Sequence, residues 1–135
     1  MKLAFDFDRT IHPYSDGWQK GVISEAPPSH VVVGMQMLRD NGHEIIIHSC
    51  RTSEDMCDSD DEIQRRLYAI MGWCNVHKIP WDKIWTGRGK PVADMYIGDL
   101  AVFCTTARHD WDSLMSRFVL SEQFREQLVD LDGKL

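Results

Sequence analysis

Two aspartates near the N-terminus have the type and spacing for nucleophilic and acid–base chemistry. Asp6 and Asp8 close an apolar stretch that begins at Lys2 and is typical of a strand. A regular strand would point the two carboxylates to opposite faces, so one site can use both only if the chain leaves the strand at Phe7 or Asp8. One carboxylate could then attack a phosphoryl group, and the other could protonate the leaving alcohol and later activate water.

Three further polar side chains stand at or near the ends of later apolar stretches: Ser49, Lys90 and Asp99. Taken singly, each has an ordinary interpretation, as a helix-capping hydroxyl, a surface ammonium and a turn-forming carboxylate. Taken with Asp6 and Asp8, they give one site three carboxylates, a hydroxyl and a lysine. Asp6 and Asp99 would suit Mg²⁺, and the lysine and hydroxyl would balance the charge of a transferred phosphoryl group. The set therefore predicts phosphoryl transfer.

The elements that must position these residues alternate between strand and helix. Apolar patterns predict strands over 2–8, 43–48, 83–85 and 94–97, helices over 29–40 and from about 61 to a stop near 72–75, and packing helices after 108. This order predicts an α/β fold, a three-layer Rossmann-like parallel sheet with helices on both faces. Ligands bind outside the carboxyl ends of the strands in such sheets, and the candidate residues fall on that edge.

The composition is that of an ordinary globular chain. Its 135 residues fit a single domain over 1–135, because one hydrophobic core normally serves about 100 to 200 residues. The formal net charge of -6 argues against a protein whose main task is to grip nucleic-acid phosphates. The four cysteines and six histidines lack zinc or redox spacings. With no membrane-spanning stretch and no signal-peptide pattern, a cytoplasmic protein with no membrane partner is expected.

The polar motifs, in their order along the chain, resemble those of the haloacid dehalogenase-like (HAD) hydrolase superfamily. Its first motif, Asp-x-Asp-x-Thr, is matched by residues 6–10, and its second, an apolar strand that ends in Ser or Thr, by residues 45–49. Lys90 matches the third motif, and residues 95–99 match the fourth. The resemblance covers roughly residues 2–102. The chain is similar in particular to the small, capless HAD proteins of bacteria and phages.

The resemblance implies a role for each of these residues. Asp6 would be the nucleophile that forms an aspartyl-phosphate, and Asp8 would be the general acid and base. Asp6, Asp8 through its carbonyl, and Asp99 would hold Mg²⁺ as the cofactor. The phosphate-binding residues would be Thr10, Ser49 and Lys90, with Thr10 bracing the first loop by hydrogen bonding. The implied activity is that of a Mg²⁺-dependent phosphatase.

Two residues depart from the family pattern. Arg9 stands where the family usually has Gly, and Gly98 stands where the small relatives usually have a further acid. Arg9 fits if its backbone needs no positive φ, and its side chain would either add a cation beside the phosphate or point to solvent. Gly98 leaves the fourth motif with one carboxylate, Asp99, which would lower the affinity for metal. A Gly-Asp ending also occurs within the superfamily.

The chain has no room for a cap domain, the insertion that often selects small substrates in this superfamily. What remains is a flap over 9–28 and a C-terminal helical segment over about 108–132. By analogy, capless members often act on macromolecules or large phosphorylated substrates, or borrow a lid from a partner, which leaves a homo-oligomer open. The candidates for substrate contact are Arg9, His12, Trp18 and Arg51. Of the five tryptophans, Trp18 is the candidate platform for a nucleic-acid base.

Three functional hypotheses follow. The first is a Mg²⁺-dependent phosphomonoesterase that acts through an aspartyl-phosphate, with the 3′-phosphate end of a nucleic acid as one alternative substrate. The second is a phosphate- and Mg²⁺-binding interaction module without turnover, suggested by Arg9 and Gly98. The third, a receiver-type signalling domain, needs its phosphoacceptor aspartate at the end of a middle strand, where this chain has Ser49. Ser49 therefore disfavours the third class.

Overall fold

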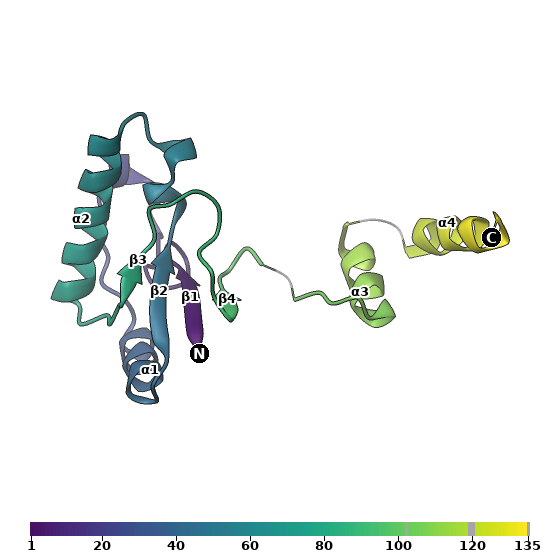
Figure 1. The fold of residues 1–135 in the computed structure, drawn as a ribbon, viewed down its shortest axis with the longest axis horizontal. Coiled ribbons are helices and arrows are strands. Elements are labelled where there is room, and N and C mark those ends of the chain that lie inside the picture. Colours follow the sequence, from purple (N-terminus) through teal and green to yellow (C-terminus); the bar gives the residue numbers. More distant parts are fainter. Residues whose placement is uncertain (102, 119–120, 135) are drawn as a thin grey trace. The chain divides into compact units, whose positions relative to one another are not determined.

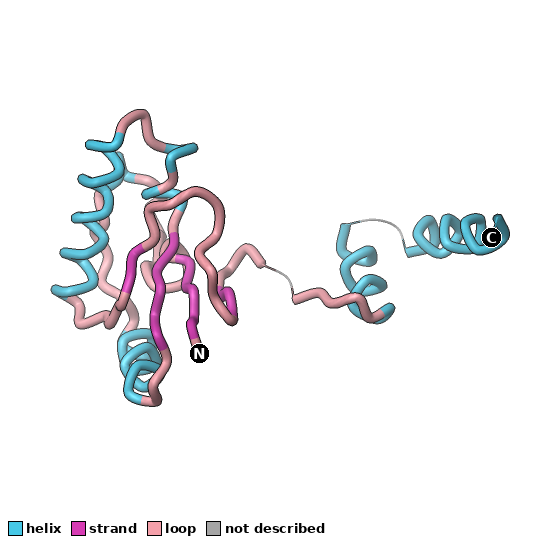
Figure 2. The backbone as a smooth tube through the Cα atoms, in the orientation of Figure 1, coloured by secondary structure: helices cyan, strands magenta, loops and turns pink. Residues whose placement is uncertain are grey.

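The expected alternation of strand and helix is present in the computed structural model of the chain, which describes residues 1–101, 103–118 and 121–134 (Figure 1; Figure 2). The chain divides into two compact units, Met1–Leu100 and Ala101–Leu135. The expectation of one domain over residues 1–135 stays a prediction. All of the candidate site residues lie in the first unit.

The first unit, which is described in full, contains four strands, two α-helices and three short 3₁₀ turns. Its strands are β1 (Lys2–Asp6), β2 (Glu44–His48), β3 (Lys83–Ile84) and β4 (Met95–Ile97). Its helices are α1 (Ser29–Asp40) and α2 (Asp60–Val76), and its 3₁₀ turns are η1 (Gln19–Gly21), η2 (Cys50–Thr52) and η3 (Glu54–Met56). Every strand and helix thus lies where the apolar patterns predict one.

The two α-helices have recognisable end signals. At the start of α2, Ser59 Oγ accepts a hydrogen bond from the backbone N–H of Glu62 at 3.2 Å. At the end of α1, Gly42 takes a φ of 87°, and the N–H of His43 donates to the carbonyl of Leu38 at 3.2 Å. A left-handed glycine of this kind turns the chain out of the helix and directly into β2.

One helix end differs from its prediction. The sequence predicts a stop for α2 near 72–75, where Gly72 is typical of a helix end, but the helix continues to Val76. Trp73 and Cys74 are both buried in the core, and the helix must pass through Gly72 to place them there. Tertiary packing therefore overrides the local signal.

The four strands form one parallel sheet in the order β3-β2-β1-β4. Figure 1 shows β1 in the middle, with β2 on one side and β4 on the other. Asp6 lies opposite His48 in the register, and Phe5 lies opposite both Ile47 and Ile97. The carboxyl ends of the strands therefore meet at one edge. This mixed α/β architecture, a parallel sheet flanked by helices, is the predicted fold class and is consistent with a Rossmann-like three-layer fold.

The hydrophobic core lies between the helices and one face of the sheet. Leu3 and Phe5 of β1 are buried there together with Ile45 and Ile47 of β2. Both helices contribute to the same core: Met35 from α1, and Ile70, Trp73 and Cys74 from α2. The helices α1 and α2, which connect β1 to β2 and β2 to β3, therefore share one core with these strands.

The loop between β3 and β4 arches past the carboxyl ends of the strands (Figure 1). It is fixed at two points: Tyr96 Oη donates to the carbonyl of Pro91 at 2.6 Å, and Trp85 Nε1 donates to the carbonyl of Gly89 at 3.0 Å. Pro91 is itself fully buried. These contacts hold the glycine-rich loop, with Lys90 in it, at the edge where the candidate residues gather.

The second unit contains, among its described residues, the helices α3 (Arg108–Phe118) and α4 (Ser121–Lys134). At the start of α3, the backbone N–H of Thr105 donates to the carboxylate of Asp110 at 3.0 Å. Arg108 Cζ of α3 lies 5.7 Å from the centre of the Phe124 ring of α4. In the part of the chain that the structure describes, no helix is both long and apolar enough to cross a membrane.

Candidate active site

The first loop folds tightly around a carbonyl at the end of β1. The Phe7 carbonyl accepts hydrogen bonds from the N–H groups of Ile11 and His12, both at 3.0 Å. The N–H of Phe7 donates to Asp6 Oδ1 at 2.9 Å, and the Phe7 ring is fully buried. The chain therefore leaves the strand at Phe7, which is the departure that Asp6 and Asp8 need in order to serve one site.

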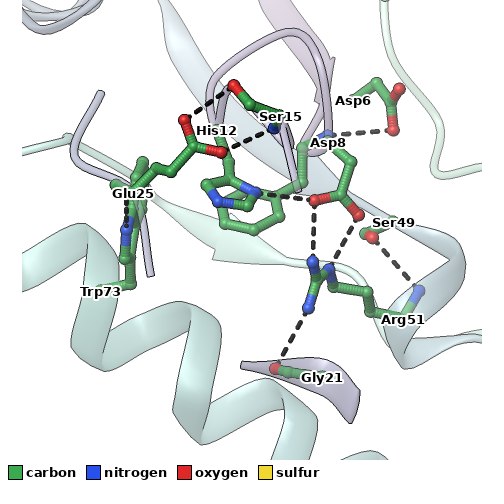
Figure 3. A network of polar contacts seen from close by, with 10 residues as sticks. Asp6, Asp8, His12, Ser15, Gly21, Glu25, Ser49, Arg51 and Trp73 are labelled. Carbon is green, nitrogen blue, oxygen red and sulfur yellow. Dashed lines mark hydrogen bonds and ion pairs between the residues drawn. The ribbon is translucent and has the colours of Figure 1, made fainter. Parts of the chain in front are cut away.

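Asp8 is held by a buried arginine, as Figure 3 shows. Arg51 Nε donates to Asp8 Oδ2 at 2.8 Å and Arg51 Nη2 donates to Oδ1 at 3.0 Å, which makes a bidentate ion pair. His12 Nδ1 lies 3.0 Å from the same Oδ1, and the side chains of His12 and Arg51 are each only 3% exposed. Both carboxylate oxygens have partners, so the orientation of Asp8 is set before any substrate binds.

Arg51 also ties the flap to the sheet. Its Nη1 donates to the carbonyl of Gly21 at 3.2 Å, and its guanidinium carbon lies 4.9 Å from the centre of the Trp18 ring and 5.7 Å from that of Tyr14. The sequence suggested a substrate contact for Arg51, whereas the structure places its charge on Asp8. Arg51 comes just after β2, the strand next to β1, but no local pattern in the sequence marks it as the partner of Asp8.

The flap is fastened at further points and is strained. Ser15 donates to the Glu25 carboxylate from its N–H at 2.6 Å and from its hydroxyl at 2.8 Å, and Trp73 Nε1 of α2 donates to the Glu25 carbonyl at 2.8 Å. Four flap residues other than glycine have left-handed backbones: Arg9, Tyr14, Gln19 and Lys20. Such backbones cost roughly 1–3 kcal/mol each and persist only where their surroundings hold them. Specific hydrogen bonds therefore hold the flap in place beside the candidate site.

Two residues of the first motif differ from expectation. Arg9 has a φ of 65°, so the condition that its backbone need no positive φ is not met. This left-handed conformation explains why glycine suits the position. The guanidinium of Arg9 lies on the exposed side of the loop, 5.6 Å from the centre of the Tyr14 ring. Thr10 Oγ1 is buried and makes no hydrogen bond within the described residues, so the expected bracing bond is not seen.

Asp6 lies half-buried where β1 meets the end of β4. The pKa of its carboxyl is raised from 3.8 to about 6, first by burial and then by the hydrogen bond and charge of nearby Asp99, while the bond from the Phe7 N–H acts in the opposite direction. The charge of Asp8 also raises it. Asp8 and Asp99, which were expected to share a site with Asp6, therefore both lie near enough to act on it electrostatically.

In metal-free buffer, we expect stability to depend on pH through Asp6. Its folded pKa of about 6 lies above the 3.8 of an ordinary aspartate, so its contribution to stability is fully present below about pH 4 and is lost as the pH rises through 6. Asp6→Asn removes the ionisable carboxyl, so the variant does not lose this stability as the pH rises. The melting temperature of the variant minus that of the wild type should therefore grow between about pH 4 and pH 7 and then level off. A difference that stays constant over this range would contradict the raised pKa.

Gly98 leaves room for the Asp6 side chain. A Cβ atom at residue 98 would lie 3.1 Å from Asp6 Cβ and 3.8 Å from Asp6 Oδ2. The first distance is tighter than nine in ten real Cβ contacts. A second acid at this position, which the small relatives usually have, would therefore press on Asp6. Close packing against Asp6 therefore explains the glycine at residue 98. Asp99 is the acid that remains at this strand end.

For the phosphatase activity that the sequence resemblance implies, Gly98→Ala is expected to lower the turnover of an aryl phosphate about tenfold. The added methyl group must push Asp6 aside by a few tenths of an ångström, and a displacement of about 1 Å can cost about 10²-fold in rate. The matched control is Gly34→Ala in α1, where an added Cβ meets nothing within 4 Å. It should keep the wild-type rate and gain about 0.5–1 kcal/mol of stability, measured by urea unfolding. An unchanged kcat in Gly98→Ala would show that the reaction tolerates this displacement.

Ser49 and Lys90 lie at the same edge with different partners. Ser49 Oγ accepts a hydrogen bond from the N–H of Arg51 at 3.1 Å and so caps η2, as its ordinary interpretation predicts. Lys90 Nζ lies 4.9 Å from the centre of the Tyr96 ring. Burial, and then the charge of Lys90, lower the pKa of His48. The structure thus brings Ser49 to the Arg51 side of the edge and Lys90 to the Tyr96 side.

Two carboxylates at this edge, those of Asp6 and Asp99, are of the kind that Mg²⁺ prefers. Asp99 raises the pKa of Asp6, a crowding of like charges that a hard cation would relieve. The carboxylate of Asp8 is engaged by Arg51 and His12, which leaves the Asp8 carbonyl as the expected ligand. The described parts of the chain hold no group of three or more His, Cys, Asp or Glu side chains suited to a metal. Two carboxylates completed by water and substrate oxygens fit Mg²⁺.

Two cavities adjoin the Trp18 side chain. The first, of about 370 Å³, is lined by Asp8, Tyr14, Trp18, Cys50, Arg51, Met56 and Arg66. The second, of about 280 Å³, is lined by Trp18, Lys20, Gly21, Ile23, Arg51, Glu62, Arg65, Arg66 and Ala69. The guanidinium carbons of Arg51 and Arg66 each lie 4.9 Å from the centre of the Trp18 ring, which is 41% exposed. Trp18, the candidate platform, therefore stands beside Asp8 and outside the core.

The chain has a distant structural neighbour of low sequence identity. No protein-family model matches the sequence, and no curated protein matches it. One chain of the solved structure described as "Structure of Pnkp1/Rnl/Hen1 complex" aligns over 87% of this chain and 34% of that chain, with 14% sequence identity and a TM-score of 0.44. The present chain thus spans about a third of the length of that neighbour.

Proposed function

We propose that the chain is a Mg²⁺-dependent phosphomonoesterase that acts through an aspartyl-phosphate, as its resemblance to the HAD hydrolases implies. The observation that carries the proposal is the meeting of Asp6 and Asp99 at the carboxyl edge of the sheet, with Asp8 fixed beside them. A half-buried carboxylate next to a second one is electrostatically unfavourable, and perturbed groups of this kind cluster at functional sites.

Asp6 supplies the nucleophile in the proposed reaction. Its Oδ2, the oxygen that does not accept the bond from Phe7, attacks the phosphorus, and the bond from phosphorus to the leaving oxygen breaks. The leaving oxygen takes a proton from Asp8. Water then attacks the phosphorus of the aspartyl-phosphate and returns a proton to Asp8, which releases inorganic phosphate and the Asp6 carboxylate. Arg51 and His12 position Asp8 for both proton transfers.

The other roles at this edge, in the proposed reaction, are to bind Mg²⁺ and the phosphoryl oxygens. Asp6, Asp99 and the carbonyl of Asp8 would hold Mg²⁺, which neutralises charge on the phosphoryl oxygens when it is bound. The Ser49 hydroxyl and the Lys90 ammonium bind phosphoryl oxygens by hydrogen bonding and charge. The chain's own cations therefore offset part of the repulsion between the carboxylates and an incoming phosphate.

Hydrolysis of p-nitrophenyl phosphate with and without Mg²⁺ tests the proposal. We expect phosphate release that requires Mg²⁺ and stops with EDTA, and we expect Asp99→Asn to lower kcat about 100-fold. The matched control is Asp40→Asn, which removes an exposed carboxylate at the end of α1 and should keep the wild-type rate. Nucleotides, sugar phosphates, phosphopeptides and phosphorylated DNA ends then define the substrate. A rate that is independent of both Mg²⁺ and Asp99 would contradict the proposal.

A second candidate is a phosphate- and Mg²⁺-binding module without turnover. The observation that favours it is the full engagement of Asp8, whose two oxygens already have Arg51 and His12 as partners. A general acid must give a proton to the leaving oxygen, and the side chains of Arg51 and His12 already contact both oxygens of Asp8. Calorimetric titration with phosphate and Mg²⁺ separates the two candidates. Tight binding without hydrolysis of any member of the substrate panel would favour the module.

Within the first candidate, the 3′-phosphate end of a nucleic acid is one substrate hypothesis, and Trp18 is the observation that favours it. The Trp18 ring is partly exposed and lines the same cavity as Asp8, where a base could stack on it. Release of phosphate from a 3′-phosphorylated oligonucleotide, with none from a sugar phosphate, would support this substrate. The reverse pattern would exclude it.

A further inference from the structure

The cavity of about 280 Å³ beside Trp18 concentrates positive charge in an acidic protein. Its lining carries four cations, Lys20, Arg51, Arg65 and Arg66, and one acid, Glu62, whereas the whole chain has a net charge of -6. We refer to this cavity as the cationic pocket. Its volume is several times the roughly 30 Å³ that one water occupies in the liquid. A hollow lined by charges of one sign raises the local concentration of ligands of the opposite sign.

Two of the four cations make no ion pair, so a ligand could pair with them. Arg51 and Arg66 are each paired with a carboxylate. In residues 1–100, all of which the structure describes, Lys20 and Arg65 make no ion pair. The acid of the pocket, Glu62, is engaged by Arg66 and by the N–H of Asp58. An anion in the pocket would therefore meet Lys20 and Arg65 without displacing an existing partner.

The backbone around Lys20 is unusual in the same place. Gln19 and Lys20 have left-handed backbones, with φ values of 46° and 55°, a conformation that residues other than glycine rarely adopt. The turn is closed by the N–H of Gly21, which donates to the carbonyl of Trp18 at 2.8 Å. The strained turn thus puts Trp18 and Lys20 together on the lining of the cationic pocket. Strain that is retained in this way is typical of ligand sites.

The cationic pocket adjoins the cavity that contains Asp8, because Trp18, Arg51 and Arg66 line both. Under the proposed function, a phosphomonoester that extends from Asp8 along this cavity would meet the cationic pocket at the residues that line both. We infer that the cationic pocket is a subsite for a second phosphate group of the substrate. This inference rests on the proposed function. The second phosphate could belong to a nucleoside bisphosphate or be the next internucleotide phosphate of a strand, which present the same chemistry.

Kinetics of the double variant Lys20→Gln/Arg65→Gln test the subsite. The substrates are adenosine 3′-phosphate, adenosine 5′-phosphate, adenosine 3′,5′-bisphosphate and a dinucleotide with one terminal phosphate. We expect the wild type to show a kcat/KM about tenfold higher for the substrates with two phosphates, and the double variant to lose this advantage. The matched control, Lys2→Gln/Arg39→Gln, removes the same charge at the amino edge of the sheet and should keep the advantage.

Each pattern of kcat/KM values either supports or overturns the subsite. An advantage for both two-phosphate substrates, lost in the double variant, supports the subsite and shows that any second phosphate suffices. An advantage for the dinucleotide alone, also lost in the double variant, supports the subsite and assigns its ligand to a nucleic-acid strand. Equal kcat/KM values for substrates with one and two phosphates overturn the inference. An advantage that survives the loss of Lys20 and Arg65 overturns it as well.

A binding measurement separates the subsite from the proposed reaction. Calorimetry on Asp6→Asn, with and without the changes at Lys20 and Arg65, compares adenosine 3′,5′-bisphosphate with adenosine 5′-phosphate. If no substrate is turned over but the bisphosphate binds about tenfold more tightly through Lys20 and Arg65, the subsite stands and the phosphatase proposal fails. Turnover without any gain in binding gives the opposite result. Added salt should reduce the gain, because exposed charges are screened.

Discussion

Asp6→Asn is expected to abolish phosphate release from p-nitrophenyl phosphate, a fall of about 10³-fold or more, and to raise the melting temperature by about 3 °C in metal-free buffer near pH 8. Activity is lost because the amide cannot form the aspartyl-phosphate. Stability is gained because the variant no longer carries a half-buried charge beside Asp99. Steady-state kinetics and differential scanning calorimetry measure the two effects on one preparation.

The opposite signs of these two effects make the result for Asp6 specific. A misfolded variant would lose activity and stability together, which would show that Asp6 is needed for folding. The exposed carboxylate variant Asp40→Asn should change neither quantity. Wild-type turnover in Asp6→Asn would show that another group is the nucleophile.

Arg51→Gln is expected to lower the free energy of unfolding by about 3–5 kcal/mol, because breaking a buried ion pair leaves a charge without its partner. The Arg51 side chain is 3% exposed, and its loss removes two hydrogen bonds to Asp8 and one to the carbonyl of Gly21. Turnover should also fall, by about 10²-fold, because Asp8 is no longer positioned. Urea unfolding followed by tryptophan fluorescence gives the first quantity, and steady-state kinetics give the second.

A double-mutant cycle shows whether the loss comes from the Arg51–Asp8 pair. Asp8→Asn combined with Arg51→Gln should cost less than the sum of the single changes, with a coupling of about 1–3 kcal/mol. The matched control is Arg39→Gln, which breaks the more exposed ion pair with Asp82 and should cost at most about 1 kcal/mol. Additive losses at Asp8 and Arg51 would show that the pair does not stabilise the fold.

The strand ends that hold the candidate residues could be predicted from the sequence. Residues 45–47 are three consecutive isoleucines between charged or polar neighbours, a pattern that suits a strand buried on both faces, and all three are buried in β2. Asp6 follows an apolar run directly, and Ser49 follows the isoleucines after one further residue, His48. Parallel order then brings the strand ends to one edge, which is a property of the fold class and needs no knowledge of side-chain contacts.

The partner of Asp8 could not be predicted in the same way. Arg51 lies 43 residues from Asp8 along the chain, and no local pattern distinguishes a buried, paired arginine from an exposed one. The left-handed backbone at Lys20 could not be predicted either, because local propensity disfavours it. It depends on distant groups that hold the flap in place, such as Trp73, which donates a hydrogen bond to Glu25.

The central place of β1 in the sheet also sets the order in which the site can be assembled during folding. Leu3 pairs with Ile45 and, much farther along the chain, with Met95. Closing the longer loop costs more chain entropy, so the pairing of β4 is expected late, after β1 and β2 have met. Asp99 reaches Asp6 only when β4 is in place. A partly synthesised or partly folded chain therefore holds the proposed nucleophile without its companion carboxylate, and the proposed activity would depend on completion of the sheet.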